Sequence, residues 1–190
     1  MKKIITWMCV LVLISMAIVG CGNQEVQKDD ERINIVATTT MLADAVKVIG
    51  GDKVNVEGLM GPGIDPHLYK VSAGDVAKMQ QAEIVIYNGL HLEGKMGEIF
   101  EDMVKQNKVI LEVTEKISVD KLISGDSSIG SHDPHIWFNV ELWIEAVKEI
   151  EKTLSSYDQE NKEVYKANVT DYVKELESLN KYVEERAKEV

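Results

Sequence analysis

The chain has 190 residues, with 21 Lys and Arg against 32 Asp and Glu, so its formal net charge at pH 7 is -11. An acidic protein repels phosphate backbones, which argues against a nucleic-acid partner. The two cysteines, Cys9 and Cys21, both precede the first predicted strand, so the folded part has no thiol for a disulfide, a metal ligand or a nucleophile.

Residues 1–20 have the pattern of a secretory signal peptide. Lys2 and Lys3 precede an uncharged apolar run from Ile4 to Val19. An uncleaved membrane anchor is the alternative, but the run is short for a span of about 20 residues. Residues 21–32 are polar and lack apolar periodicity, which predicts a flexible tether.

Short β-branched runs alternate with helical patterns over residues 33–157. The predicted strands are Ile33–Thr38, Val54–Met60, Ile84–Tyr87 and Val109–Val113. The predicted helices are Met41–Ile49, one from a capping box at Ser72 to Gln81, Lys95–Gln106, and one that starts near Val140. This alternation predicts an α/β fold, with a four-stranded parallel sheet flanked by helices.

The last segment, residues 158–190, predicts one long α-helix. It has no Gly or Pro from Gln159 onward, and its apolar residues recur at steps of three and four: Tyr165, Val169, Tyr172, Leu176, Leu179 and Val183. A coiled-coil dimer is the alternative use of this stripe. No Gly, Asn or Pro stop signal follows the helix, so we expect it to be truncated.

The tripeptide Asp-Pro-His occurs twice, as Asp65-Pro66-His67 and as Asp133-Pro134-His135. It takes two of the three prolines and two of the four histidines of the chain. Neutral imidazole is the commonest side-chain ligand of first-row metals. Proline restricts the loop, and the Asp can brace the turn or accept a hydrogen bond from the imidazole. The alternative is that Asp-Pro only starts a turn and each His lies on the surface.

The other two histidines are secondary candidates for metal ligands. His91 lies between two leucines in NGLHLEGK and is alternatively a helix-entry or pocket-wall residue. His132 precedes His135 by three positions in a loop rich in Gly and Ser. It is either a spare ligand or has no such role.

Three stretches carry a resemblance to a known family. GPGIDPHLYKVSAGDV, IVIYNGLHLEGKM and SHDPHIWFNVELW, in this order, resemble the solute-binding lipoprotein of bacterial manganese and zinc ABC transporters. Adhesin-like metal-binding lipoproteins are related to it. The sequence IVGC, which ends at Cys21, resembles a lipobox. It implies lipidation of Cys21 and attachment to the outer face of the cell membrane.

The resemblance implies two α/β lobes joined by a long rigid helix, with the metal bound between the lobes. It makes His67 and His135 metal ligands contributed by the N-terminal lobe, residues 33–157. The remaining ligands, a His or Glu and an Asp, are expected from a C-terminal lobe beyond the bridging helix, which these 190 residues do not include.

The resemblance also implies capture of one divalent ion, delivery to an ABC permease and no enzymatic activity. Zinc-type members often carry a His-rich loop, but KLISGDSSIGSHD has one His, so we expect Mn²⁺ first and Zn²⁺ next. A monomer is expected. The alternative functions are a surface adhesin that needs neither His, and a metallohydrolase, for which the chain offers no HExxH motif.

Overall fold

A computed structural model of the chain describes residues 31–125 and 131–189. The predicted signal peptide, the lipidation of Cys21 and most of the tether lie outside the described residues. Within the described ranges, no helix combines the length and the apolar character needed to cross a bilayer.

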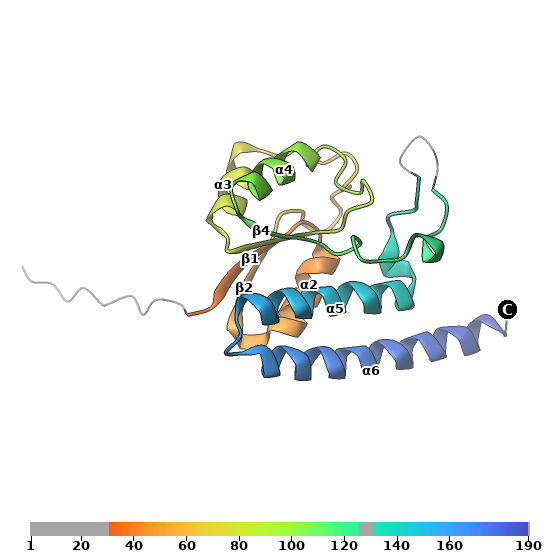
Figure 1. Cartoon of the computed structure of the whole chain (residues 1–190). Coiled ribbons are helices and arrows are strands. Elements are labelled where there is room, and N and C mark those ends of the chain that lie inside the picture. The colour runs from red at the N-terminus through yellow and green to blue at the C-terminus, as the bar shows by residue number, and fades with distance from the viewer. Residues whose placement is uncertain (1–30, 126–130, 190) are drawn as a thin grey trace, which may run out of the picture. The chain divides into compact units, whose positions relative to one another are not determined.

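Four strands alternate with helices along the chain, as the sequence pattern predicts (Figure 1). The strands are β1 (Ile33–Ala37), β2 (Val54–Gly58), β3 (Ile84–Tyr87) and β4 (Val109–Glu112). The α-helices are α2 (Thr40–Gly50), α3 (Ala73–Gln81), α4 (Gly97–Lys105), α5 (Val140–Tyr157) and α6 (Lys162–Ala187). Short 3₁₀ turns lie at Gly51–Lys53, Val119–Lys121 and Ile136–Phe138.

The four strands form one parallel sheet in the order β2-β1-β3-β4. The predicted α/β fold is therefore confirmed. From β1 the chain continues to β2, toward one edge of the sheet, and from β3 it continues to β4, toward the opposite edge. The order of the strands thus reverses between β1 and β3, which is where open parallel sheets usually hold their ligand.

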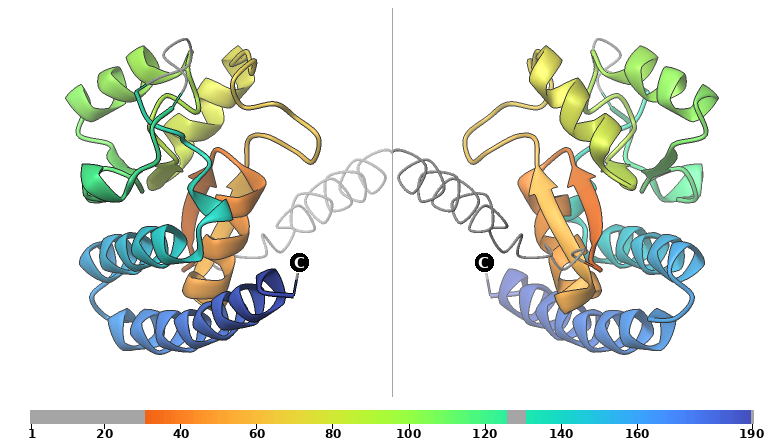
Figure 2. Two further views of the ribbon diagram at one scale, coloured as in Figure 1. Left: turned by 90° about the vertical axis from the view of Figure 1, so that its right-hand side faces the viewer. Right: turned by 90° about the vertical axis from the view of Figure 1, so that its left-hand side faces the viewer.

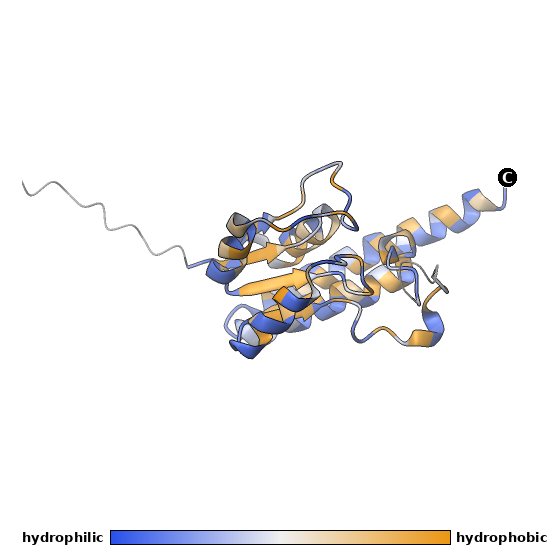
Figure 3. Ribbon diagram, turned by 90° about the horizontal axis from the view of Figure 1, so that it is seen from above, coloured by the Kyte–Doolittle hydropathy of each residue, from blue (hydrophilic) through white to orange (hydrophobic). Residues whose placement is uncertain are grey.

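Alternate side chains of the strands point to the two faces of the sheet and build two apolar clusters. Ile35 and Ile84 face α2, α5 and α6, whereas Val36 and Val85 face α3 and α4. Figure 2 shows the two helical layers on either side of the sheet, and Figure 3 shows how hydrophobic the strands are. The central strands β1 and β3 are largely buried on both faces, which explains why Ile84–Tyr87 is a continuous apolar run.

Capping groups fix the helix ends close to their predicted positions. The Ser72 side chain accepts from the Asp75 amide, and the Asp75 side chain accepts from the Ser72 amide, so the predicted capping box is confirmed. Gly51, with φ +57°, ends α2, where Gly relieves the cost of a left-handed backbone. The Asn139 side chain caps α5.

Helix α6 lies beside α5, antiparallel to it (Figures 1 and 2). Tyr165, Val169 and Leu176 are buried against α5 and α2. Leu179 and Val183 are 48% and 49% exposed, so only the first part of the predicted stripe is covered. That covered part packs within the chain, which leaves it no free surface for a coiled-coil partner.

Candidate metal centre

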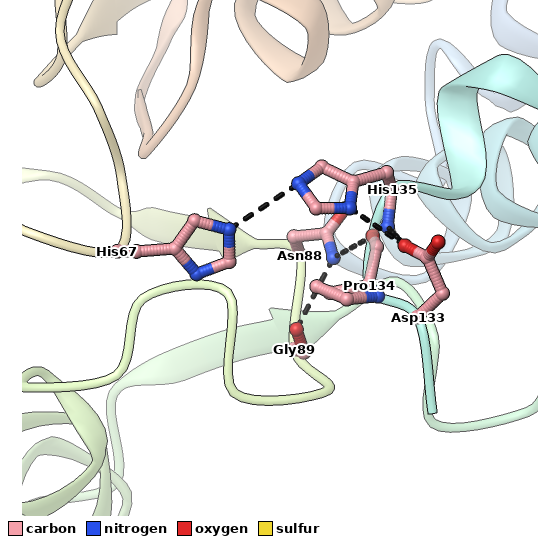
Figure 4. A network of polar contacts seen from close by, with 6 residues as sticks. All are labelled: His67, Asn88, Gly89, Asp133, Pro134 and His135. Atoms are coloured by element: carbon pink, nitrogen blue, oxygen red, sulfur yellow. Dashed lines mark hydrogen bonds and ion pairs between the residues drawn. The ribbon is translucent and has the colours of Figure 1, made fainter. Parts of the chain in front are cut away.

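The two Asp-Pro-His loops converge at the edge of the sheet formed by the carboxyl ends of its strands. His67 follows β2, and His135 precedes α5 in the segment after β4. Their Nε2 atoms lie 3.2 Å apart, and their ring centroids lie 5.3 Å apart (Figure 4). Two imidazoles that are distant in the sequence therefore point their Nε2 atoms at each other. This arrangement differs from the alternative in which each His lies on the surface by itself.

Both loops use their Asp in the same way. Oδ1 of Asp65 accepts from the His67 amide at 2.9 Å, and Oδ1 of Asp133 accepts from the His135 amide at 2.9 Å. An Asp side chain that binds the backbone two residues later forms an Asx-turn, which holds a tight loop. The bracing predicted for these carboxylates is present in the geometry.

The two histidines differ in what holds their rings. Oδ1 of Asp133 also contacts Nδ1 of His135 at 2.6 Å, whereas no such contact joins Asp65 to the His67 ring among the contacts of the described residues. The His135 amide and ring, in that order, lower the pKa of Asp133. An ionised carboxylate only accepts hydrogen bonds, so Nδ1 of a neutral His135 carries the proton and Nε2 presents a lone pair.

The spacing of the pair fits a shared metal ion. Two bonds of about 2.0–2.1 Å at a tetrahedral angle place their nitrogens about 3.3–3.4 Å apart, close to the 3.2 Å between the two Nε2 atoms. Without a metal, Nε2–H of His67 can donate to Nε2 of His135. A cation at this position would take the place of that proton, provided that the proton of His67 moved to Nδ1.

The pair borders a cavity of about 480 Å³. Its wall is formed by the start of α2, the loop after β2 and the segment around Trp137. The Trp137 and His135 rings meet edge to face, with centroids 5.2 Å apart. Trp137 therefore packs against the His135 ring, and the sequence analysis did not single it out.

The secondary candidates lie elsewhere. His91 and His132 line a different cavity of about 620 Å³, together with Tyr87, Phe100 and Glu112. His91 is exposed and has φ +63°, and Nδ1 of His132 is buried without a hydrogen-bond partner among the residues that the structure describes. Over residues 31–125 and 131–189, no three or more His, Cys, Asp or Glu are grouped so as to hold a metal ion. Among the described residues, the pair His67–His135 therefore has no third His, Cys, Asp or Glu grouped with it that could hold a metal ion.

Two buried polar residues behind the pair were missed by the sequence analysis. Asn88 and Glu93 are 1% and 4% exposed. Glu93 accepts from the Asn88 amide, and the Asn88 side chain donates to the Pro134 carbonyl in the loop that carries His135. The stretch NGLHLEGK contains both, but a metal-ligand search selects the His in it. Their burial is seen only in the structure, and the sequence carries no local signal for it.

Comparison with known proteins places the chain among metal-binding transport proteins. The family model described as ZnuA, zinc-uptake complex component A periplasmic, matches residues 35–190. The manganese-binding lipoprotein MntA of Bacillus subtilis is 41% identical over 177 residues, which are 92% of this chain and 57% of the relative. The zinc-binding protein TroA of Treponema pallidum is 37% identical over 87% of this chain and 53% of its own length.

The fold agrees with solved structures. The periplasmic zinc binding protein TroA from Treponema pallidum superimposes with a TM-score of 0.79 at 38% identity, over 84% of this chain and 56% of that chain. The Zn(II)-bound AdcA of Streptococcus pneumoniae gives a TM-score of 0.71 at 30% identity, over 80% of this chain and 32% of that chain. The chain spans little more than half the length of MntA and TroA. These matches show that the chain belongs to the ZnuA family of metal-binding proteins of manganese and zinc ABC transporters.

Proposed function

We propose that this chain captures a divalent transition metal as part of the solute-binding component of an ABC uptake system, with His67 and His135 as ligands. The observation that carries the proposal is the 3.2 Å approach of the two Nε2 atoms from loops braced in the same way. Membership of a family of binding components, and not of enzymes, supports it.

For the metal, we propose Mn²⁺ first and Zn²⁺ next. The two imidazoles do not decide between the ions: a carboxylate among the remaining ligands would favour Mn²⁺, and a third imidazole would favour Zn²⁺. The relatives include one named for manganese and one named for zinc. The segment KLISGDSSIGSHD before His135 has one His. The lack of a His-rich loop supports the preference for Mn²⁺ over Zn²⁺.

For location and partner, we propose export and attachment to the outer face of the membrane through Cys21. The bound ion would be delivered to an ABC permease. Several relatives are named as lipoproteins of metal ABC transporters, which supports this route.

For the layout, we propose that residues 33–157 form a metal-binding lobe and residues 158–190 a bridging helix. The additional length of the relatives is where the other ligands would lie. Two imidazoles leave the coordination of Mn²⁺ or Zn²⁺ incomplete, so the affinity of these residues alone should be modest.

Isothermal titration calorimetry with Mn²⁺ and with Zn²⁺ tests the proposal. His67→Ala and His135→Ala should each abolish the binding heat of the chain, and His91→Ala should leave it unchanged. Heat that survives both substitutions in the Asp-Pro-His loops would refute the assignment. A binding constant lowered only by His91→Ala or His132→Ala would move the site to the 620 Å³ cavity.

A further inference from the structure

We propose that Asn88 and Glu93 position His135 for metal binding, through a buried hydrogen-bond network that runs behind the metal site. The inference rests on the proposed function in one respect, namely that His135 is a ligand. The rest of it concerns the geometry of the metal-free protein. Neither residue touches the two Nε2 atoms, so both would be positioning residues.

The network begins at the carboxylate of Glu93. Its Oε1 accepts from the Asn88 amide at 2.8 Å and from the Thr38 hydroxyl at 2.6 Å, and its Oε2 accepts from the Gly89 amide at 3.2 Å. Burial raises the pKa of Glu93, and the Thr38, Asn88 and Gly89 donors act in the opposite direction. A buried carboxylate is costly unless it is hydrogen-bonded, and here it receives three donors.

These bonds secure an unusual backbone. Gly89, Leu90 and His91 have φ angles of +89°, +50° and +63°. Left-handed conformations are costly for residues other than Gly and persist where surrounding contacts determine them. Glu93 reaches back to the start of this turn and provides such contacts.

Asn88 is fixed at its backbone and points its side chain at the other loop. Glu93 accepts from its amide, and its carbonyl oxygen accepts from the Thr114 hydroxyl at 2.8 Å. The two hydrogens of Nδ2 have separate acceptors, the Gly89 carbonyl at 3.1 Å and the Pro134 carbonyl at 2.9 Å (Figure 4). The bond to Pro134 joins segments 46 positions apart.

The Pro134 carbonyl is an acceptor that shapes the backbone of His135. It also accepts from the Ile136 amide at 2.9 Å, and His135 has φ -81° and ψ 54°. These values describe an inverse γ-turn with His135 at its centre. Asn88 therefore holds the peptide group that precedes His135, while Asp133 holds the His135 amide and ring.

The position of the network in the sheet supports a role for the site. Thr38 follows β1 and Asn88 follows β3, the two strands between which the strand order reverses. Backbone amides at this point commonly bind the ligand itself. Here the amides of Asn88 and Gly89 donate to Glu93 and are not free to bind a ligand. The segment after β3 instead supports the loop that carries His135, through the bond from Asn88 to Pro134.

The test uses Asn88→Ala and Asn88→Asp, with Tyr165→Phe as the matched control. Asn88→Asp keeps the shape of the side chain but points a carboxylate oxygen at the Pro134 carbonyl. Tyr165→Phe also removes one hydrogen bond, the partly buried one from the Tyr165 hydroxyl to Asp158 at 2.7 Å, in the contact between α5 and α6. Urea unfolding places the three variants on one stability scale.

Two readouts follow. Zn²⁺ calorimetry should show a loss of affinity of about tenfold or more for both Asn88 variants and none for Tyr165→Phe, since groups that orient ligands typically contribute 10–100-fold. In the metal-free protein, the Ile136 amide should exchange its hydrogen faster in both Asn88 variants and at the wild-type rate in the control.

Each result decides one claim. If His67→Ala and His135→Ala leave Zn²⁺ binding intact, the proposed function fails, whereas the exchange of the Ile136 amide still tests the positioning of His135. Unchanged exchange and unchanged affinity in folded Asn88 variants would overturn the positioning role. If both variants fail to fold, Asn88 serves the general stability of the fold, which overturns the role as well.

Discussion

His67 and His135 are 68 positions apart in the chain, yet their Nε2 atoms lie 3.2 Å apart. The parallel sheet explains the approach, because all four strands end at the same edge and the loops after β2 and β4 meet above it. Each loop is braced by an Asp two residues before its His. The predictions below follow from this arrangement and from the packing that supports it.

Asp133→Ala should weaken Zn²⁺ binding more than Asp65→Ala. Asp133 holds both the amide and the ring of His135, whereas Asp65 holds the amide of His67. Loss of a carboxylate partner of a metal-binding imidazole typically costs 10–100-fold in affinity, and we expect less than about tenfold for Asp65→Ala. Calorimetry on the two variants measures the difference, and equal losses would contradict the asymmetry.

Leu176→Ala and Leu179→Ala form a matched pair on α6. Leu176 is 8% exposed and Leu179 is 48% exposed. Leu176→Ala should lower the free energy of unfolding by about 2–5 kcal/mol, because it leaves a cavity between helices. Leu179→Ala should change it by about 0.5 kcal/mol or less. Urea unfolding of this 190-residue chain gives both values; a large loss for Leu179→Ala would show that it packs against something.

Ser72→Ala should destabilise the chain by about 1 kcal/mol, the usual value of an N-cap. The Ser72 hydroxyl accepts from the Asp75 amide at 3.2 Å at the start of α3. Ser72→Gly is the control, since Gly at an N-cap costs only a few tenths of a kcal/mol. Thermal unfolding that ranks Ala and Gly equally would argue against the cap.

The stability of the chain should fall with acid partly through Asp75. The hydrogen bond from the Ser72 amide is the largest cause that lowers the pKa of Asp75 below its ordinary value of 3.8. A carboxyl whose folded-state pKa is depressed stabilises the fold above its unfolded pKa, and this contribution is lost as the pH falls through the folded pKa.

Asp75→Asn should therefore be less stable than wild type at pH 7, with a gap that narrows below about pH 4. Urea midpoints measured from pH 7 to pH 2 test this. A constant gap over that range would mean that ionisation of Asp75 does not contribute. Asp102→Asn, a substitution in an exposed pair with Lys105, serves as the surface control.

Much of the fold follows from local sequence signals. The apolar run Ile84–Tyr87, the capping box at Ser72 and the start of α5 at Val140 are where the pattern predicts them. These features depend on neighbouring residues, which a sequence displays directly. Predicted ends differ by a few residues elsewhere, for example in α4, which begins at Gly97 and not at Lys95, because helix ends depend on caps as well as on periodicity.

The candidate site was predictable only in part. The repeated Asp-Pro-His predicts a shared role for His67 and His135, since rare residues recur there together, and the structure brings their Nε2 atoms to 3.2 Å. The roles of Asn88 and Glu93 depend on contacts across the sheet edge, to Pro134 and Thr38, and no local pattern encodes those contacts. The uncovered end of the α6 stripe is similar, because periodicity shows that a face is apolar but not what packs on it.

The most direct test of the central claim is nitrogen-15 NMR of the histidine side chains during a Zn²⁺ titration. We predict that Nε2 of His67 and Nε2 of His135 both shift to metal-bound positions, while the ring nitrogens of His91 and His132 stay unchanged. Shifts confined to His91 or His132, or a Zn²⁺-bound state in which either Nε2 of the pair remains unperturbed, would contradict it.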